Sequence, residues 1–345
     1  MSIETKRIKN TQLPSMYFGC DPEFFLEKDG EVIGSEKLIS ENGLEFLGGL
    51  GTNKVIRDGI QTELNPAPNT CRQRVARNIS RCFIALKEQI TTDGTGIKVN
   101  FEQTRTITEK EMDSLSDDSK QFGCKESRSV AGENSKIAIK DASKYFKRSA
   151  GGHIHLSPPS YGKAMVQNDA ERVIKLMDII VGNTCVLLDR DKGNIERRKN
   201  YGKAGEFRLP SHGIEYRVLS NFWLRSYVLM SFVFSLTRFA LHCYLNGHAE
   251  RFFAVVDYDD IQKAINENDA ELARKNFDKV KELFPIGDID VNNPLTQKNL
   301  KKFDKFVEKG MDHWFKEDPL THWKNVKPEG GSDGWEAFVE HTLSE

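Results

Sequence analysis

The sequence predicts an α+β protein, and the residue pattern supports this in three ways. Several segments within the first 223 residues alternate with a period of two, as strands do. Between these segments, apolar residues recur every three to four positions, which is typical of helices packed on one face. After Asn246 the pattern is charged and helical.

The predicted strands share a feature, because each places a pair of polar side chains on one face. Side chains two positions apart in a strand project from the same face, roughly 6.5 to 7 Å from each other. The pairs are Asp21 and Glu23 in Tyr17–Phe25 (YFGCDPEFF), Gln61 and Glu63 in Asp58–Pro66 (DGIQTELNP), His153 and His155 in Gly151–Ser157 (GGHIHLS), and Glu206/Arg208 and Glu215/Arg217 in Gly205–Trp223. Together these side chains predict a pocket for divalent cations and polyphosphate.

The segment Gly205–Trp223 (GEFRLPSHGIEYRVLSNFW) is the most informative, because it contains two acid-x-arginine pairs. A carboxylate can hold a hard cation such as Mg²⁺, and a neighbouring arginine can bind phosphate oxygens with its planar fork. The pairs therefore indicate a site that handles a nucleotide phosphate. The alternative is an exposed strand stabilised by cross-strand ion pairs.

Helices are predicted behind the strands and after them. A first helix opens at Thr70, and others cover Glu171–Val181, Leu219–Leu245, Asp259–Phe284 and Leu295–Phe315. The apolar run Ser226–Thr237 is bracketed by Arg225 and Arg238, which leaves it too short to span a bilayer. We therefore expect a core helix there. Trp314, Trp323 and Trp335 are expected to pack the C-terminal tail.

Composition favours a cytoplasmic enzyme. The 345 residues include 50 basic and 51 acidic side chains, so net charge gives no signal for nucleic acid or a membrane surface. The six cysteines lack Cys-x-x-Cys spacing and are expected to be free thiols in a reducing compartment. The first residues, MSIETKRIKNTQLP, have no apolar core and do not form a signal peptide.

We expect a catalytic domain over residues 1–250 and a helical C-terminal extension over residues 251–345. Within the first, residues 103–142 are rich in Ser, Asp, Glu and Lys and contain few large apolar groups. That composition predicts an exposed insertion or a lid over the site.

Several of these segments also carry a family resemblance. The blocks GCDPEFF, DGIQTELNPAP, GGHIHLS, RRKNYGKAGEFR and GIEYRVLSNFWL resemble the bacteriophage COOH–NH2 ligases of type 2. These carboxylate–amine ligases are similar to glutamine synthetase and glutamate–cysteine ligase. The resemblance implies an antiparallel sheet of glutamine synthetase type whose concave face binds ATP and two or more metal ions. It also implies that an amide bond forms through an acyl phosphate.

The resemblance assigns roles to particular residues. It implies metal binding by Glu23, Glu63, His153 and Glu215, a place near the ATP phosphates for His155, and stabilisation of the transferring phosphoryl group by Arg217. We expect Arg208 to be catalytic together with Glu215 and Arg217. Glutamine synthetase has Glu-x-Glu where this chain has Asp21-Pro22-Glu23, so the role of Asp21 stays open. The separate small N-terminal domain of glutamine synthetase is not evident either.

Residue chemistry agrees with ligation. A carboxylate is a poor electrophile, so it must be phosphorylated before an amine can attack, and metals and arginine neutralise the developing charge. Oxygen-rich ligands suit Mg²⁺ or Mn²⁺. Arg197, Arg198 and Lys203 are candidates for holding the substrate carboxylate or the outer phosphates, and the alternative is a solvated basic turn.

Three other classes remain open at this point. A phosphagen-type guanidino kinase uses the same type of sheet, a metal-dependent hydrolase or oxygenase also uses His-x-His with a glutamate, and a phage structural or DNA-binding protein would need these motifs only for packing. The expected partners are a small-molecule or peptide carboxylate and an amine, with glutamate the first candidate by analogy. A homo-oligomer is compatible with the resemblance, and a phage-encoded enzyme would act in the cytoplasm of the infected host.

Overall fold

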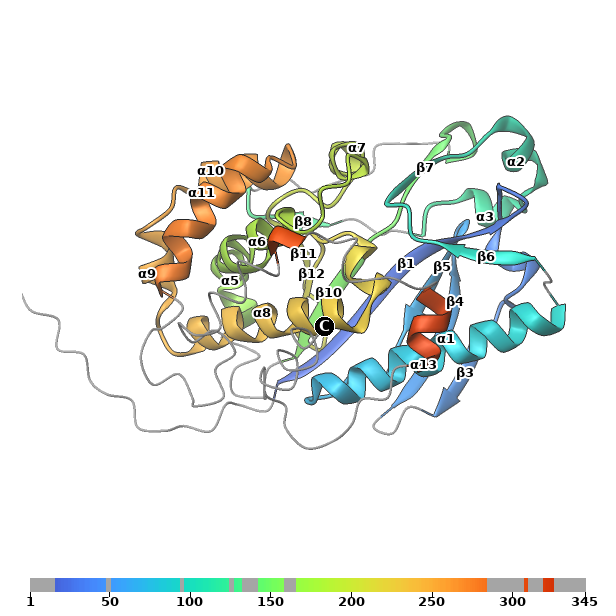
Figure 1. Ribbon diagram of the computed structural model, residues 1–345, viewed down its shortest axis with the longest axis horizontal. Coiled ribbons are helices and arrows are strands. Elements are labelled where there is room, and N and C mark those ends of the chain that lie inside the picture. The colour runs from blue at the N-terminus through green and yellow to red at the C-terminus, as the bar shows by residue number, and fades with distance from the viewer. Residues whose placement is uncertain are drawn as a thin grey trace, which may run out of the picture.

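The computed structural model describes residues 16–47, 51–93, 96–123, 127–131, 142–157, 166–283, 307–309 and 319–325. Its centre is a large antiparallel sheet with helices packed on one face (Figure 1). Ten strands form this sheet, with β3-β4-β5-β1-β10-β12-β11-β8 in spatial order and β2 and β6 paired to β1. The structure thus confirms the α+β class and the antiparallel sheet.

The strands of the main sheet are short on either side of one long central strand. Their bounds are β1 Tyr17–Lys28, β2 Glu31–Ile33, β3 Leu44–Leu47, β4 Thr52–Asp58, β5 Gln61–Asn65, β6 Ile97–Asn100, β8 Arg128–Ser129, β10 Gly152–Ser157, β11 Glu206–Arg208 and β12 Ile214–Tyr216. The predicted strand segment Asp58–Pro66 is the second half of a hairpin of β4 and β5, because Gly59 turns the chain with a positive φ of 58°.

The sheet has one polar and one apolar face. On β1, Cys20, Phe24 and Leu26 point toward the helices, while Asp21 and Glu23 point away from them. Register carries this division across the sheet, since Glu23 lies opposite Glu63, Asp21 opposite His153, and His155 opposite Glu215. Side chains predicted for the site therefore share one face.

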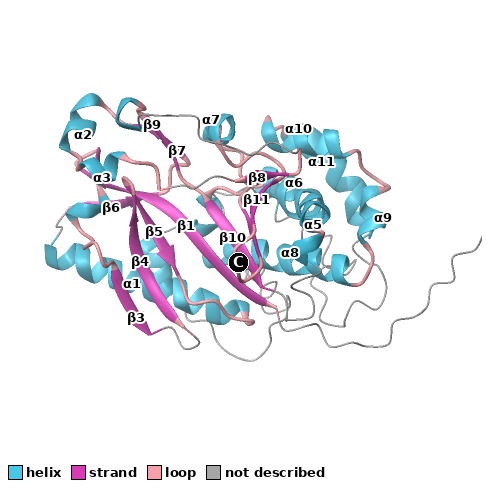
Figure 2. Cartoon of the chain, turned by 180° about the vertical axis from the view of Figure 1, so that it is seen from behind, coloured by secondary structure: helices cyan, strands magenta, loops and turns pink. Residues whose placement is uncertain are grey.

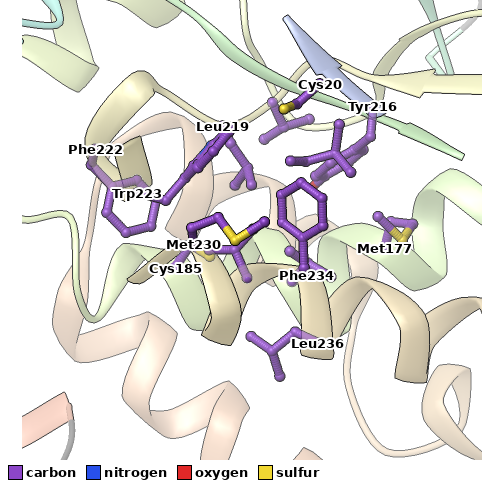
Figure 3. Packing of buried hydrophobic residues seen from close by; sticks show 14 of the residues in the cluster. Cys20, Met177, Cys185, Tyr216, Leu219, Phe222, Trp223, Met230, Phe234 and Leu236 are labelled. Carbon is purple, nitrogen blue, oxygen red and sulfur yellow. The ribbon is translucent and has the colours of Figure 1, made fainter. Parts of the chain in front are cut away.

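The apolar face is covered by the long helices α1 and α8, which Figure 2 shows behind the strands. The helices on this side and at the adjoining end of the sheet are α1 Arg72–Asp93, α5 Ala170–Met177, the π-helix η3 Asp178–Gly182, α6 Asn183–Val186, the 3₁₀ helix η4 Asn221–Arg225, α8 Tyr227–Leu245, α9 Ala249–Phe253, α10 Tyr258–Asn266, α11 Ala270–Val280, the 3₁₀ helix η5 Lys281–Leu283 and α13 Pro319–Asn325. Figure 3 shows Phe234 of α8 between Met230 and Met177, pointing toward the strands. Its ring centroid lies 5.9 Å from that of Phe18 on β1.

Local signals explain where two of the predicted helices divide and where a third changes its winding. The segment Leu219–Leu245 contains a 3₁₀ turn before α8, because the Ser226 side chain accepts from Leu229 N and starts a new helix. The segment Asp259–Phe284 divides into α10 and α11 at Asn268, whose φ is 53°. Glu171–Val181 is continuous, with a π-helical turn after α5.

The helix α8 is also long and apolar enough to cross a membrane by length and composition alone. In the structure, 83% of its most apolar window is buried inside the protein. A core helix of a folded domain has this appearance, as the bracketing of Ser226–Thr237 by charged residues led us to expect.

A smaller layer covers one end of the polar face. It contains β7 Thr104–Thr106, α2 Glu109–Ser114, α3 Asp117–Lys120, the 3₁₀ helix η2 Ala142–Lys144 and β9 Lys147–Ser149. The helix α7 Gly193–Asn200 lies nearer the other end of the sheet (Figure 1). Phe25 of β1 and Ile60 of the β4–β5 turn pack with Ile107 and Met112 of this layer in a second apolar cluster. The described part of residues 103–142 is therefore anchored to the sheet, and its action as a lid stays a prediction.

The C-terminal part contributes to the main core. Trp323 of α13 stacks on Phe83 of α1 with centroids 6.0 Å apart, and its Nε1 donates to Leu224 O at 2.6 Å. Phe277 of α11 belongs to the same apolar cluster. The domain boundary at residue 250 stays a prediction. Trp314, Trp335 and most of the predicted helix Leu295–Phe315 lie outside the described residues.

A buried carboxylate behind the sheet predicts a pH-dependent stability. Asp178 accepts hydrogen bonds from the Tyr216 and Tyr258 hydroxyls, each at 2.7 Å. Burial raises its pKa to about 7, although both hydrogen bonds favour the ionised form. The folded protein therefore holds a proton that the unfolded chain releases near pH 4, and this contribution to stability is lost as pH rises through 7.

We expect Asp178→Asn to remove this dependence. Between pH 5 and pH 8, the unfolding free energy of the natural protein should fall relative to the variant by about 2–3 kcal/mol. Denaturant unfolding at several pH values measures the difference, with the exposed Asp259→Asn as the control. Parallel pH profiles for Asp178→Asn and the natural protein would contradict the assignment.

Candidate functional site

The polar face of the sheet holds two adjacent groups of possible metal ligands, which include Glu23, Glu63 and Glu215 of the predicted set and contain His155 where His153 was predicted. In the first, ligand atoms of Glu23, Asp58 and Glu63 lie within 4.8 Å of one another. In the second, those of Asp21, His155 and Glu215 do so. Residues separated by almost 200 positions thus converge, as the motifs predicted, but in two sets.

The first group is a crowded set of acids around β1, β4 and β5. Burial and the charge of Asp58 raise the pKa of Glu23 to about 8. Burial and the charge of Asp21 raise the pKa of Asp58 to about 6 and that of Glu63 well above its usual range. Partly buried carboxylates this close repel one another, so the group favours a divalent cation.

One oxygen of Glu23 is held by a dense set of donors. Its Oε2 accepts from Gln61 Nε2 at 3.1 Å, from Gly151 N at 2.8 Å and from the Tyr201 hydroxyl at 3.2 Å. All three donors bind Oε2, so Oε1 is the oxygen through which Glu23 would contact a cation. The donors fix the carboxylate before anything binds.

The second group combines carboxylates with imidazoles. Asp21 Oδ2 lies 3.1 Å from His155 Nε2, and Asp21 Oδ1 lies 3.3 Å from His153 Nδ1. Burial opposes the ionisation of Asp21, but the charges of His155 and His153 hold its pKa well below its usual range. Asp21, whose role the sequence left open, is the centre of this group.

The two histidines differ in charge preference. Burial and the positive charge of Arg217 lower the pKa of His153 to about 4, so its ring is neutral near pH 7. Burial disfavours charge on His155 as well, but the carboxylates of Asp21 and Glu215 outweigh it and raise its pKa. His153 Nδ1 is also 3.6 Å from Glu215 Oε1, so either ring can contribute to the group.

Polar atoms without hydrogen bonds test whether a cation fits here. Among the described residues, both ring nitrogens of His153, Nε2 of His155 and Oδ1 of Asp21 are buried and make no hydrogen bond. Buried polar atoms rarely lack partners, and Asp21 Oδ1, His155 Nε2 and one nitrogen of the neutral His153 ring can each offer a lone pair. A divalent cation would satisfy them, so the residues fit the metal ions that the resemblance implies.

Two arginines lie beside the second group. Arg217 Nη1 is 2.5 Å from Glu215 Oε1, and Arg208 Nη1 reaches the same oxygen at 3.4 Å. Arg217 is buried, with its guanidinium 5.5 Å from the centre of the Tyr201 ring. Glu206, the carboxylate of the other acid-x-arginine pair, instead accepts a hydrogen bond from Gly202 N at 2.9 Å. Glu215 and Arg217 are therefore in contact as predicted, and Arg208 contacts Glu215 from the neighbouring strand.

Two of the three basic residues before β11 are buried in the protein. Arg197 donates to the carbonyls of Arg217, Val218 and Leu219 at 2.7–3.1 Å, so it braces the chain after β12. Arg198 is buried and donates to Asn268 Oδ1 at 3.0 Å. These contacts are made to protein atoms, and the assignment of Arg197 and Arg198 to the substrate carboxylate or the outer phosphates stays a prediction. Lys203 is exposed on the turn before β11, and its role stays a prediction.

Sequence reasoning missed Asp58 and Tyr201. Asp58 lies opposite Gln61 across the β4–β5 hairpin, so a period-two rule along one strand does not reach it. The Asp58-Gly59 dipeptide is a hairpin signal that would have placed it. Tyr201 sits between strands, and no local pattern marks the contacts of its hydroxyl with Glu23 and of its ring with His153.

Gly151 gives a geometric test of the site. A Cβ at this position would lie 2.1 Å from the Tyr201 hydroxyl and 2.4 Å from His153 Nε2. We expect Gly151→Ala to displace both side chains and lower kcat on the order of 10²-fold, because misplacement of about 1 Å has this effect. Gly19→Ala on β1 is the matched control, since its Cβ would meet atoms only at 3.5 Å or beyond. Equal kcat for both variants in a steady-state assay would contradict the geometry.

Glu63→Gln should change stability in opposite directions with and without metal. Removing one of the crowded charges should raise the metal-free melting temperature at pH 8 by roughly 2–4 °C. The gain produced by Mg²⁺ should fall by more than half, because a ligand is lost. Thermal melts in chelator and in Mg²⁺ measure both effects, and the exposed Glu45→Gln on β3 is the control. A Mg²⁺ gain equal to that of the natural protein would exclude Glu63 as a ligand.

Two solved structures are distant likenesses of this chain. A bifunctional glutathione synthetase from Pasteurella multocida has a TM-score of 0.42 at 10% identity, covering 85% of this chain and 52% of that one. The chain thus spans about half of the length of that synthetase. GmaS in a form without ligand has a TM-score of 0.35 at 12% identity, with 84% of this chain and 73% of that chain covered. No curated protein matches the sequence.

The comparison with protein families is decisive. Residues 109–324, more than half of the chain, match the family described as Phage phiEco32-like COOH.NH2 ligase-type 2. The matched range contains His153, His155, Glu215 and Arg217, while β1, β4 and β5 precede it. The chain therefore belongs to this family, as its motifs indicated.

Proposed function

We propose that the protein joins a carboxylate to an amine at the expense of ATP, through an acyl phosphate. The observation that carries this proposal is the pair of acidic groups on one face of the sheet, beside the buried guanidinium of Arg217. Two neighbouring cation sites and an arginine are what transfer of a phosphoryl group from ATP requires. Family membership supports the ligase reaction and leaves its mechanism to be tested.

In this proposal, different residues bind the two cations and hold the ligands in position. Glu23, Asp58 and Glu63 would hold one cation, and Asp21, Glu215 and a histidine the other. Bound Mg²⁺ or Mn²⁺ would neutralise phosphate oxygens and align the reacting groups. Hydrogen bonds from Gln61, Gly151 and Tyr201 hold Glu23 in place before ATP arrives.

Arg217 is the proposed stabiliser of the phosphoryl group in transit. Its guanidinium is anchored on Glu215 and lies against Tyr201, so little side-chain freedom remains to be lost in the reaction. Arg208 is only partly buried and contacts the same carboxylate, which suits it to a substrate anion that enters from solvent. The proposed substrates are an amine and a small-molecule or peptide carboxylate, for which glutamate is the first candidate. The proposed place of the reaction is the cytoplasm.

Hydroxylamine should intercept the acyl phosphate. With ATP, Mg²⁺ and the carboxylate substrate, we expect a hydroxamate together with equal amounts of ADP and phosphate. Coupled ADP release identifies the carboxylate, and the ferric hydroxamate colour reports the product. Formation of AMP and pyrophosphate would show an adenylating enzyme, and a phosphorylated guanidine without hydroxamate would show the phosphagen-type kinase.

Arg217→Lys should impair turnover far more than ATP binding. Lysine keeps the charge but lacks the planar fork, so kcat should fall on the order of 10² to 10³-fold. ATP affinity, measured by calorimetry, should change only modestly, because the interaction develops in the transition state. The exposed Arg74→Lys on α1 is the control. Near-normal kcat at an unchanged melting temperature would leave Arg217 as a structural partner of Glu215.

A further inference from the structure

His212 lies at the edge of the site, and no motif or comparison assigns it a role. It belongs to the loop of residues 209–213 that joins β11 to β12, and its side chain is exposed. Its Nε2 is 3.0 Å from Nδ1 of His155, and the two ring centroids are 5.2 Å apart. This exposed histidine thus contacts the one ring nitrogen of His155 that faces away from Asp21.

The loop holds His212 in a defined position. Gln167 Nε2 donates to the carbonyls of Pro210 and Gly213 at 3.0 and 3.1 Å, and Gly213 N donates to Pro210 O at 3.0 Å. A Cβ on Gly213 would lie 1.9 Å from Leu156 O, so only glycine allows the loop to approach β10 this closely. The contact between His212 and His155 is therefore built into the hairpin.

The opposite nitrogen of His155 faces the acidic group. Its Nε2 lies 3.1 Å from Asp21 Oδ2 but is buried and makes no hydrogen bond within the described residues. A metal-binding imidazole needs a free lone pair on the nitrogen that faces the cation and donates its other N–H to an acceptor. The ring atom within hydrogen-bonding distance of His155 Nδ1 is His212 Nε2, at 3.0 Å, so His212 is placed to be that acceptor.

We infer that His212 is a positioning residue that fixes the ring orientation and tautomer of His155 for a divalent cation held with Asp21 and Glu215. This inference rests on the cation-dependent ligase chemistry proposed above. It predicts that His212 acts on one cation site and not on the other, because His155 belongs to the group of Asp21 and Glu215 and not to that of Glu23, Asp58 and Glu63.

Mn²⁺ binding to the full chain tests the inference. We expect titration calorimetry of the natural protein to resolve two classes of Mn²⁺ site. His212→Ala should weaken one class 10- to 100-fold, the usual effect of losing a partner that orients a ligand, and leave the other class unchanged. His212→Gln should recover most of the affinity, since its side-chain carbonyl can accept from His155 Nδ1. The neighbouring exposed Ser211→Ala is the control, and the melting temperature of each metal-free variant should match that of the natural protein.

The outcomes separate this inference from the proposed function. Two Mn²⁺ classes that are unchanged in His212→Ala would overturn the role of His212 and leave the metal sites standing. Loss of both classes with a lowered melting temperature would also overturn it, because His212 would then support the fold. A natural protein that binds no Mn²⁺ would overturn the cation sites themselves, and the role of His212 with them.

Discussion

The concentration of negative charge on one face of the sheet is the constraint on which the rest of the structure depends. Five carboxylates, from Asp21, Glu23, Asp58, Glu63 and Glu215, belong to two groups. Within each group the ligand atoms lie within 4.8 Å of one another. Burial and mutual repulsion raise the pKa of the three acids in the first group. Such a face is stable only where the scaffold behind it is rigid and where positive charge can enter in front.

The apolar face supplies that rigidity. Phe18, Cys20 and Phe24 alternate with the acids of β1 and pack in the main core, so the same strand that displays the charges is fixed by burial. Trp323 extends this core from the C-terminal part of the chain through its stacking on Phe83. A strand anchored in this way can hold carboxylates in a fixed arrangement that a loop could not maintain.

The buried arginines near the site differ in their partners. Arg217 neutralises Glu215 within the site, whereas Arg197 and Arg198 are turned inward to backbone and side-chain oxygens. In the first group, the three donors to Glu23 Oε2, from Gln61, Gly151 and Tyr201, are all neutral. The face is thus left acidic at one end and balanced at the other, which suits cations bound together with a phosphate chain.

The period-two pairs could be predicted from the sequence because the direction of alternate side chains depends only on the extended backbone. That rule was sufficient to place Glu23, His153, His155 and Glu215 on polar faces, and the apolar run around Ser226–Thr237 was sufficient to predict a core helix. Family membership followed from the same motifs. These inferences succeed because each depends on residues that are close together in the chain.

Tertiary structure decided how those side chains are grouped. Asp21 pairs with the histidines, and Asp58 joins Glu23, because register and the β4–β5 hairpin set which strands are adjacent. Arg197 points into the protein for a similar reason, since the carbonyls it binds are 20 to 22 positions away. A local pattern carries no information about contacts made across strands. The sequence by itself therefore determined which residue types face the site, and only the folded chain determined which of them act together.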